Sequence, residues 1–274
     1  MLSTLSLLLL LRTPVSDQPE TMFNTISAGV PVRVARINLA DPRVHISAQV
    51  SHGCPGNWED FETLVSRSRP TLAVNGAYFS KGSLKPIGDI VCGGKLVSSG
   101  MMGTALAITR DNDVVIKRVK WGHAEDWSEY ETVVGCGPAL VLGGKVDVHP
   151  EREGFHDPHV MCSTRRLGVG LTSDKHLLIV TTLESVTFTK WAEVMRGLGC
   201  VDAMNLDAGA SLAMYYHGKT LIKPGRKLTN LLLVHVDKVD RSASERTVKV
   251  VAPSTPLSLG AERPTVEPRQ AGRK

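Results

Sequence analysis

The feature that most constrains the fold is a repeated pattern of two short apolar segments joined by a polar turn. In residues 44–50, apolar and polar residues alternate strictly. Alternation with a period of two places the apolar side chains on one face of a β-strand. Turns rich in Gly, Asp and Asn between such segments predict a sheet with mostly antiparallel pairing. The expected strand–turn–strand units are 32–39 with 44–50, 105–109 with 114–119, 139–142 with 146–148, 169–172 with 177–181, and 214–216 with 220–222.

Two further segments carry apolar residues at helical spacing, around residues 58–65 and 191–198. Each is preceded by a residue that favours an N-cap and followed by a residue that ends helices. These are Asn57 and Pro70 for the first helix, and Thr189 and Gly199 for the second. Apolar strands are expected next, at 71–75 and 203–207. The fold class predicted is α+β: a single domain with a twisted, largely antiparallel or mixed sheet packed by two main amphipathic helices.

Composition divides the 274 residues into three parts. Residues 1–22 contain a leucine run at 7–11, which is interpreted either as a degraded or atypical export signal or as a plain N-terminal segment. Residues 23–237 form the expected folded domain. Residues 238–274 are rich in Pro, Ser, Glu and Arg, and are predicted to be a disordered basic tail. An extracytoplasmic or secreted location is expected, with a cytoplasmic location as the alternative.

Charge and hydropathy argue against two classes of partner. The tail holds eight Lys/Arg and four Asp/Glu, so it accounts for +4 of the net charge of +5 and leaves the body nearly neutral. A neutral body is a poor footprint for a nucleic-acid-binding protein, although binding through the basic tail is the alternative. No apolar run approaches the roughly 20 residues that span a bilayer. The five cysteines form no CxxC pair, so no structural zinc site is expected.

Polar residues at the ends of two predicted strands are the first candidates for a functional site. Asn75 ends the strand 71–75 and is followed by Gly76. Asn205 and Asp207 lie two residues apart, so they share one face of the next apolar strand. Burying such groups without partners is costly, which favours a functional interpretation. The alternatives are an ordinary Asn-Gly turn and a structural aspartate that caps a tight turn.

Phosphate chemistry is suggested by small residues and arginines. The run 208–211 after Asp207 could present successive backbone N–H groups to an anion. Arg166 and Arg226 could bind a phosphate through two donors each, although ordinary surface arginines are the alternative. The histidine-containing segment 149–159 is interpreted as a solvated loop, because it lacks HExxH spacing and its Pro and Gly residues interrupt a helix.

Six short motifs follow one another along residues 32–236 in an order that resembles the phosphodiester glycosidase family. They are Asn75-Gly76-x-x-Phe79; Pro86-x-Gly88 with Gly94; Gly137-Pro138; Arg166-x-Gly168-x-Gly170; Leu198 to Asp207 with Ser211; and Arg226-x-x-x-Asn230. The resemblance implies a hydrolase that removes a sugar, such as N-acetylglucosamine, from a sugar–phosphate diester. Many bacterial relatives are exported and are tied to envelope or exopolysaccharide chemistry.

With this resemblance the candidate residues take roles. The expected catalytic residues are Asp207, Asn75 and Asn205; the expected phosphate-binding residues are Arg166, Arg226, Gly209 and Ser211; the expected substrate-binding residues are Asn230, Phe79 and Gly88. Asp207 is the candidate for general acid or base catalysis or for positioning water. A second acid, if the mechanism needs one, would be Asp89 or Glu184. No cofactor or metal is expected, with a divalent cation beside Asp207 as the alternative.

One departure from the family leaves a second function open. The family turn usually has the sequence Asp-Gly-Gly-Gly-Ser, but here Ala208 and Ala210 replace two of the glycines, and Leu167 follows Arg166 where a small polar residue is usual. An alanine at a positive φ would cost about 1–2 kcal/mol and would crowd a bound phosphate. The partner expected for an active enzyme is a sugar phosphodiester. The alternative is a non-catalytic module that binds a phosphorylated glycan at an envelope or particle surface.

Overall fold

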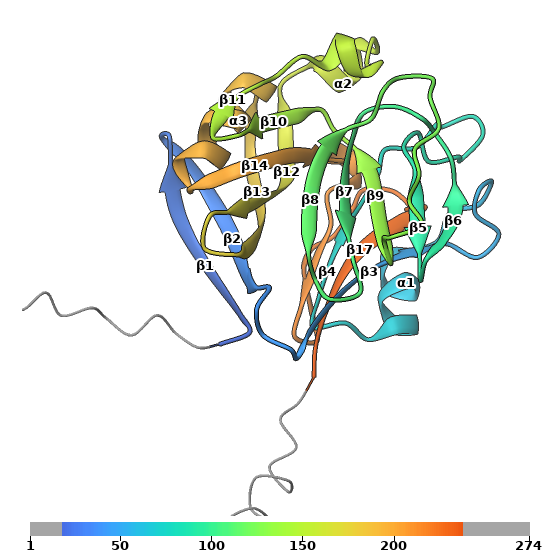
Figure 1. The fold of residues 1–274 in the computed structure, drawn as a ribbon, viewed down its shortest axis with the longest axis horizontal. Coiled ribbons are helices and arrows are strands. Elements are labelled where there is room, and N and C mark those ends of the chain that lie inside the picture. The colour runs from blue at the N-terminus through green and yellow to red at the C-terminus, as the bar shows by residue number, and fades with distance from the viewer. Residues whose placement is uncertain (1–17, 238–274) are drawn as a thin grey trace, which may run out of the picture. The chain divides into compact units, whose positions relative to one another are not determined.

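The computed structural model describes residues 18–237, and these residues are mostly strand, arranged in three sheets (Figure 1). The first sheet has the order β1 (Glu20–Ser27), β2 (Val30–Asn38), β13 (His176–Val186), β12 (Thr164–Thr172), β14 (Cys200–Leu206), β10 (Ala139–Leu142) and β11 (Lys145–Val146). The second has the order β16 (Lys219–Ile222), β15 (Met214–Tyr216), β4 (Leu72–Asn75), β17 (Asn230–Val236) and β3 (Val44–Val50). The third has the order β6 (Lys95–Ser98), β5 (Ile90–Cys92), β9 (Thr132–Cys136), β7 (Thr104–Ile108) and β8 (Val114–Arg118).

Antiparallel pairing is confirmed for the strand pairs of all three sheets. The expectation of one sheet packed by two helices is corrected to three sheets in a mostly β structure. The reason is that several strands are apolar on both faces. In β13, Leu177 and Ile179 enter the central core, whereas Leu178 and Val180 face a second apolar cluster. The central core takes residues from all three sheets, so they are packed against one another.

The helices cover outer sheet faces. Helix α3 (Phe188–Gly197) packs Trp191 and Met195 against the outer face of the seven-stranded sheet, beside β10, β11 and β14 (Figure 1). Helix α1 (Phe61–Ser68) packs Phe61 and Leu64 against β4 and β17. The remaining helical elements are short: α2 (Pro158–Met161) and the 3₁₀ turns η1 (Pro150–Glu153) and η2 (Gly209–Ser211).

The predicted N-caps are each displaced by two or three residues. Helix α1 begins after Asp60 rather than Asn57. Helix α3 begins after Thr187 rather than Thr189, and the Thr187 side chain accepts a hydrogen bond from the Lys190 backbone N–H at 3.2 Å. The Lys190 amide is the third N–H of the helix and has no acceptor within the helix, so the Thr187 hydroxyl satisfies it.

Four of the five strand–turn–strand units pair as predicted, and the first does not. β2 pairs with β1 and β13, whereas β3 pairs with β17 in another sheet. The intervening turn is held by Asp41, whose carboxylate binds the Arg43 guanidinium at 2.5 and 2.9 Å. The turn therefore carries the chain from one sheet to the next instead of closing a hairpin.

The first strand begins before residue 23, the predicted start of the folded domain. Strand β1 starts at Glu20, three residues ahead of Phe23. The leucine run at 7–11 and the basic tail 238–274 lie outside the described residues. Within residues 18–237, the helices are too short and too polar to cross a membrane.

Candidate functional site

The ends of β4 and β14 are joined directly, although they are 132 residues apart in sequence. The Asn75 side-chain amide donates to the backbone carbonyl of Asp207, and its oxygen accepts from the Ala213 N–H at 2.8 Å. The Asp207 N–H in turn donates to the Gly76 carbonyl at 2.9 Å. Asn75 therefore spans the turn that carries Asp207, and fixes that turn to the neighbouring sheet.

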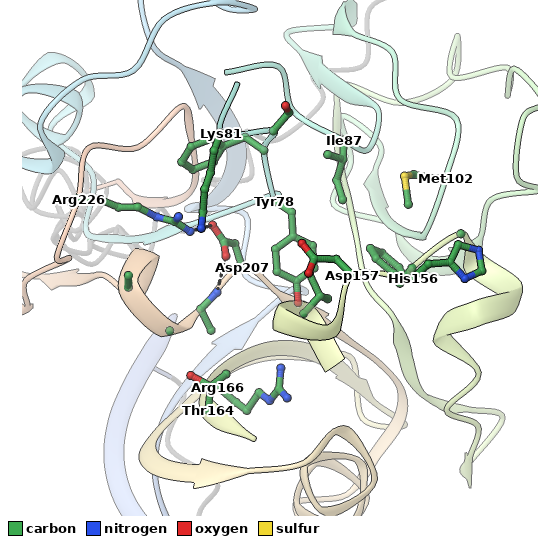
Figure 2. A pocket seen from close by; sticks show the side chains of 18 residues that line it. Tyr78, Lys81, Ile87, Met102, His156, Asp157, Thr164, Arg166, Asp207 and Arg226 are labelled. Atoms are coloured by element: carbon green, nitrogen blue, oxygen red, sulfur yellow. Dashed lines mark hydrogen bonds and ion pairs between the residues drawn. The ribbon is translucent and has the colours of Figure 1, made fainter. Parts of the chain in front are cut away.

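A cavity of about 690 Å³ opens at this junction (Figure 2). Its walls come from the segment after β4, the loop 154–160, the start of β12, the turn after β14 and the loop before β17. The predicted residues that line it are Phe79, Arg166, Asp207, Gly209 and Arg226. Lining residues that were not predicted include Tyr78, Lys81, Ile87, Met102, Phe155, His156, Asp157 and Thr164.

Asp207 is a buried carboxylate, only 4% exposed. One of its oxygens accepts from the Ala208 N–H at 2.8 Å, and the other lies 3.6 Å from the Arg226 guanidinium. Burial raises the pKa of Asp207 to about 6, while the Ser211 hydroxyl, Arg226 and the Ala208 amide oppose the rise. The carboxyl group therefore changes its protonation state near neutral pH, which suits acid–base chemistry.

Arg166 is a buried cation on the cavity wall, 1% exposed. Its guanidinium donates to the backbone carbonyls of Val186 at 3.1 Å and Cys162 at 2.6 Å, and packs on the Phe188 ring at 3.9 Å. Within residues 18–237 no carboxylate forms an ion pair with it. Burial lowers its pKa, which means that its charge is held in a place where water solvates it poorly.

Arg226 lies on the other side of Asp207 (Figure 2). Its Nε donates to the Ser211 hydroxyl at 2.7 Å, and its guanidinium lies 4.9 Å from the centre of the Phe79 ring. Ser211 is fully buried beside the cavity, so it orients Arg226 and Asp207 rather than forming part of the wall. The guanidinium groups of Arg166 and Arg226 thus lie on the same cavity as the Asp207 carboxyl group.

Besides Ser211, four predicted residues do not line the cavity, and their hydrogen bonds or close packing explain why. Asn230 is paired with the backbone N–H and carbonyl of Ala77, so it fixes the turn after β4. Gly88 packs so closely on Gly135 that a Cβ would overlap that backbone, which makes it a packing glycine rather than a substrate contact. Asn75 uses its side-chain amide in hydrogen bonds with the backbone of Asp207 and Ala213. Asn205 is fully buried, and its amide donates to the Tyr78 hydroxyl at 2.7 Å.

The two acids considered as a second carboxylate lie elsewhere. Asp89 accepts hydrogen bonds from the Gly100 and Met101 amides and from the Trp127 indole, so it is structural. Glu184 is exposed and lines a separate cavity of about 290 Å³ against β1 and β2. The second carboxylate at the main cavity is Asp157, which faces the same space as Asp207 (Figure 2).

Tyr78 and Asp157 are the functional candidates that the sequence did not reveal. Tyr78 is in the cavity wall, and burial raises the pKa of its phenol well above the ordinary value of 10. Its oxygen accepts a hydrogen bond from the Asn205 amide, and a phenol retains its own O–H as a donor. Tyr78 lies between Gly76 and Phe79 in a motif that was recognised, whereas Asp157 is in the segment interpreted as a solvated loop.

The loop 149–159 is a wall of the cavity rather than a free solvated segment. Glu153, 1% exposed, anchors it by accepting from Thr104 Oγ1 at 2.6 Å and from the Ala139 N–H at 3.0 Å. Residues 18–237 contain no group of three or more His, Cys, Asp or Glu side chains placed to bind a metal. A divalent cation beside Asp207 would also have to compete with the Arg226 guanidinium.

The sequence matches the phosphodiester glycosidase family over residues 68–235, which is more than half of the chain. The chain belongs to this family. The match includes both strand ends, both arginines and the loop that carries Asp157. A search of curated proteins finds no match.

Several solved structures share the fold of this chain. A hypothetical protein from Synechocystis superposes with a TM-score of 0.65 at 14% identity, covering 80% of this chain, which spans 62% of that protein. The catalytic domain of zebrafish N-acetylglucosamine-1-phosphodiester alpha-N-acetylglucosaminidase gives 0.65 at 19% identity, covering 81% of this chain and 85% of that one. A Burkholderia pseudomallei protein described as exported gives 0.53 at 14% identity, covering 75% and 74%. At such identities these likenesses establish the fold alone.

The altered turn of this phosphodiester glycosidase domain keeps glycine where glycine is needed. Gly209 has a φ of +56°, in the left-handed region. Ala208 has a φ of −150°, and Ala210 is absent from the residues with positive φ. The two alanines therefore do not impose the backbone strain that the sequence suggested. Arg165 supports the turn by donating to the Gly209 carbonyl at 2.7 Å.

Proposed function

We propose that this chain hydrolyses a sugar–phosphate diester, adding water to release the sugar and leave a phosphate monoester. Membership of the phosphodiester glycosidase family gives the reaction class, and the cavity supplies groups that suit it. The partner is a sugar phosphodiester, with an N-acetylglucosamine-like sugar as the first candidate.

One observation carries this proposal: Arg166 is a buried guanidinium on the cavity wall without a carboxylate partner among residues 18–237. A buried charge is costly unless a counter-ion compensates it. A bound phosphodiester anion supplies that counter-ion, in bidentate geometry that guanidinium groups favour. Arg226, on the other side of Asp207, contributes a second cation.

Asp207 is assigned the role of general acid, giving its proton to the oxygen that leaves with the phosphate. Its pKa of about 6 is already raised by burial, and an anion bound beside it raises the pKa further. The Tyr78 phenol donates a hydrogen bond to the ligand, while Asn205 holds that phenol in place. Asn75 and Asn230 position the two strand ends. Arginines that face the developing charge stabilise it in a site with little water.

The alternative function, a non-catalytic module for phosphorylated glycans, was favoured by Ala208 and Ala210. Neither alanine has a positive φ, so the strain argument for this alternative is gone. The two functions still differ in one measurable respect. A module binds a phosphorylated glycan without releasing a product, whereas an enzyme releases free sugar with turnover.

The test is a release assay on methyl phosphodiesters of several sugar 1-phosphates, with the products identified by mass. The wild-type chain is expected to release one sugar and methyl phosphate, and Arg166→Ala and Asp207→Asn are expected to lose this activity. Wild-type turnover in both variants would overturn the assigned roles. Binding of a phosphorylated glycan without any product would favour the module.

An extracytoplasmic location is part of the same proposal. It is supported by the leucine run near the N-terminus and by the likeness to a protein described as exported. Fusion of residues 1–22 to a reporter enzyme that is active only outside the cytoplasm tests this directly.

A further inference from the structure

The cavity has two chemically different ends (Figure 2). Arg226 and Lys81 lie together on one side of Asp207, whereas Ile87 and Met102 lie apart from them toward His156. Phe155 and Val160 add further apolar surface to the lining. A phosphodiester also has two ends beyond its phosphate, one sugar and one alcohol. The chemistry of the wall therefore bears on what the second alcohol is.

The apolar surface continues from the cavity toward solvent. A Cβ at Gly154 would lie 3.1 Å from the Met102 methyl carbon and 3.3 Å from the Trp121 indole, so this glycine lies in contact with both. Trp121 is 56% exposed and its ring centre is 5.6 Å from that of His156. Met102, Gly154 and Trp121 thus form a continuous track of apolar surface that leads out of the cavity. Exposed apolar surface of this kind commonly marks a binding surface.

A second sugar is poorly matched to this track. Sugar hydroxyls need hydrogen-bond partners when they lose water. The side chains of Ile87, Met102 and Phe155 offer none, and the polar groups at this end, His156 and Asp157, are on the exposed rim. An aliphatic chain, in contrast, gains free energy from every methylene that leaves water.

We propose that the second alcohol of the substrate is aliphatic, so that the natural substrate is a sugar 1-phosphodiester of an alkyl or isoprenoid alcohol. The arginines hold the phosphate and the alcohol lies along Ile87, Met102 and Trp121. This inference rests on the proposed function, since it names the substrate class of the same site.

The experiment compares N-acetylglucosamine 1-phosphodiesters of methanol, octanol, farnesol and mannose, below the concentrations at which micelles form. The octyl and farnesyl diesters are expected to exceed the methyl diester in kcat/KM by about tenfold or more. The mannosyl diester is expected to be no better than the methyl diester. Equal values for methyl and octyl diesters, or a preference for the mannosyl diester, would overturn the proposal.

Two variants locate the effect. Met102→Gln keeps the side-chain length and adds a polar amide, so the ratio of octyl to methyl kcat/KM is expected to fall toward one. Leu96→Gln is the matched control, because Leu96 is 53% exposed on β6 and does not line the cavity. It is expected to keep the wild-type ratio. If Met102→Gln keeps the wild-type ratio of octyl to methyl kcat/KM, the apolar track does not bind the alkyl group of the substrate.

A binding measurement separates this inference from the proposed hydrolysis. Octyl phosphate and methyl phosphate are titrated into the full chain, and the shift in melting temperature is recorded. If octyl phosphate binds more tightly than methyl phosphate but no diester is turned over, the apolar track is supported and the proposed hydrolysis is refuted. If the methyl diester is turned over but the two phosphates bind equally, the proposed hydrolysis is supported and the apolar track is refuted.

Discussion

Two clusters of arginine and carboxylate side chains in this molecule have opposite characters. In the first, Arg118 binds Asp147 at 2.9 Å and Glu153 at 3.0 Å, and Glu153 also accepts from Thr104 and Ala139. In the second, at the cavity, Arg226 is 3.6 Å from Asp207, and the Arg166 guanidinium contacts two backbone carbonyls and the Phe188 ring.

The pKa values of the arginine and carboxyl groups shift in opposite directions in the two clusters. Hydrogen bonds from Arg118 lower the pKa of Asp147, and although burial opposes it, the pKa of Arg118 is raised, so both ionised forms are stabilised. Burial raises the pKa of Asp207 and lowers that of Arg166, so both ionised forms are destabilised. The first cluster is complete within the protein and holds the cavity wall. In the proposed function, a bound phosphodiester completes the second cluster, and strongly shifted pKa values of this kind gather at functional sites.

The largest expected effect comes from exchanging one arginine in each cluster for methionine. Arg166→Met is expected to lower kcat/KM by about 10³-fold, because it removes a donor from the developing charge. Its free energy of unfolding should stay level or rise, since a poorly compensated buried charge is gone. Activity and denaturant unfolding are measured side by side.

Arg118→Met is the matched exchange in the closed cluster. It leaves Glu153 buried without its cation and is expected to cost about 3 kcal/mol of stability. Its kcat/KM should fall only in proportion to the unfolded fraction. A stable Arg118→Met variant, or an Arg166→Met variant that unfolds, would remove the distinction between the clusters.

Asp207→Asn is expected to show opposite effects on activity and on stability. Loss of the acid should reduce kcat by about 10²–10⁴-fold. Above pH 6 the variant should be more stable than the wild type by about 3 kcal/mol, because it buries no charge. A raised pKa in the folded state makes the wild type relatively more stable as the pH falls, so the gain should shrink between pH 6 and 3.8. Thermal unfolding across this range measures it.

The pH dependence of activity tests the protonated form of Asp207. With Asp207 as general acid, kcat/KM should be level below a pH of about 6 and fall as the pH rises through it. A rate that rises through the same pH would make Asp207 a base and reverse its role. Arg118→Met, measured over the same range, should keep the wild-type profile.

Smaller effects are expected in the turn between β14 and β15. Gly209→Ala places a side chain at a φ of +56° and should cost about 1–2 kcal/mol. Ala208→Gly should change the free energy of unfolding by less than about 1 kcal/mol, because its φ of −150° suits either residue. Equal costs in chemical denaturation would refute the assignment of the glycine requirement to position 209.

The smallest effect is on the melting temperature. Inorganic phosphate at about ten times its dissociation constant should raise the melting temperature by roughly 3–6 °C, through the charge on Arg166. Arg166→Met should abolish this shift, while Arg118→Met should retain it from a lower starting temperature. A shift that survives in Arg166→Met would place the anion elsewhere.

The sequence predicted local elements better than their arrangement, and the reason is physical. Period-two alternation reports which residues lie on one strand face, so β7, β8, β15 and β16 were found within a residue. Pairing between distant strands has no such local signal. The turn at Asp41 looked like a hairpin, yet it joins strands of two different sheets.

The sequence predicted three charged residues of the candidate site, but it did not predict most of the other residues that line the cavity. Asp207, Arg166 and Arg226 carry chemistry that their residue types disclose, and the structure brings them to one cavity. The roles of Asn75 and Asn230 could not be told from sequence, because an amide that satisfies a backbone turn looks the same as one that faces a ligand. Tyr78 and Asp157 gain their importance from the cavity alone.

The position of β17 has a consequence for how the chain is made. This strand, residues 230–236, lies between β4 and β3, which are synthesised more than 150 residues earlier. Until β17 has been synthesised, those two early strands lack the strand that pairs with both of them, and the Asn230 amide that binds the turn after β4 is missing. Assembly of the cavity is therefore deferred until residues 230–236 have been synthesised, and a product truncated before them would leave it incomplete.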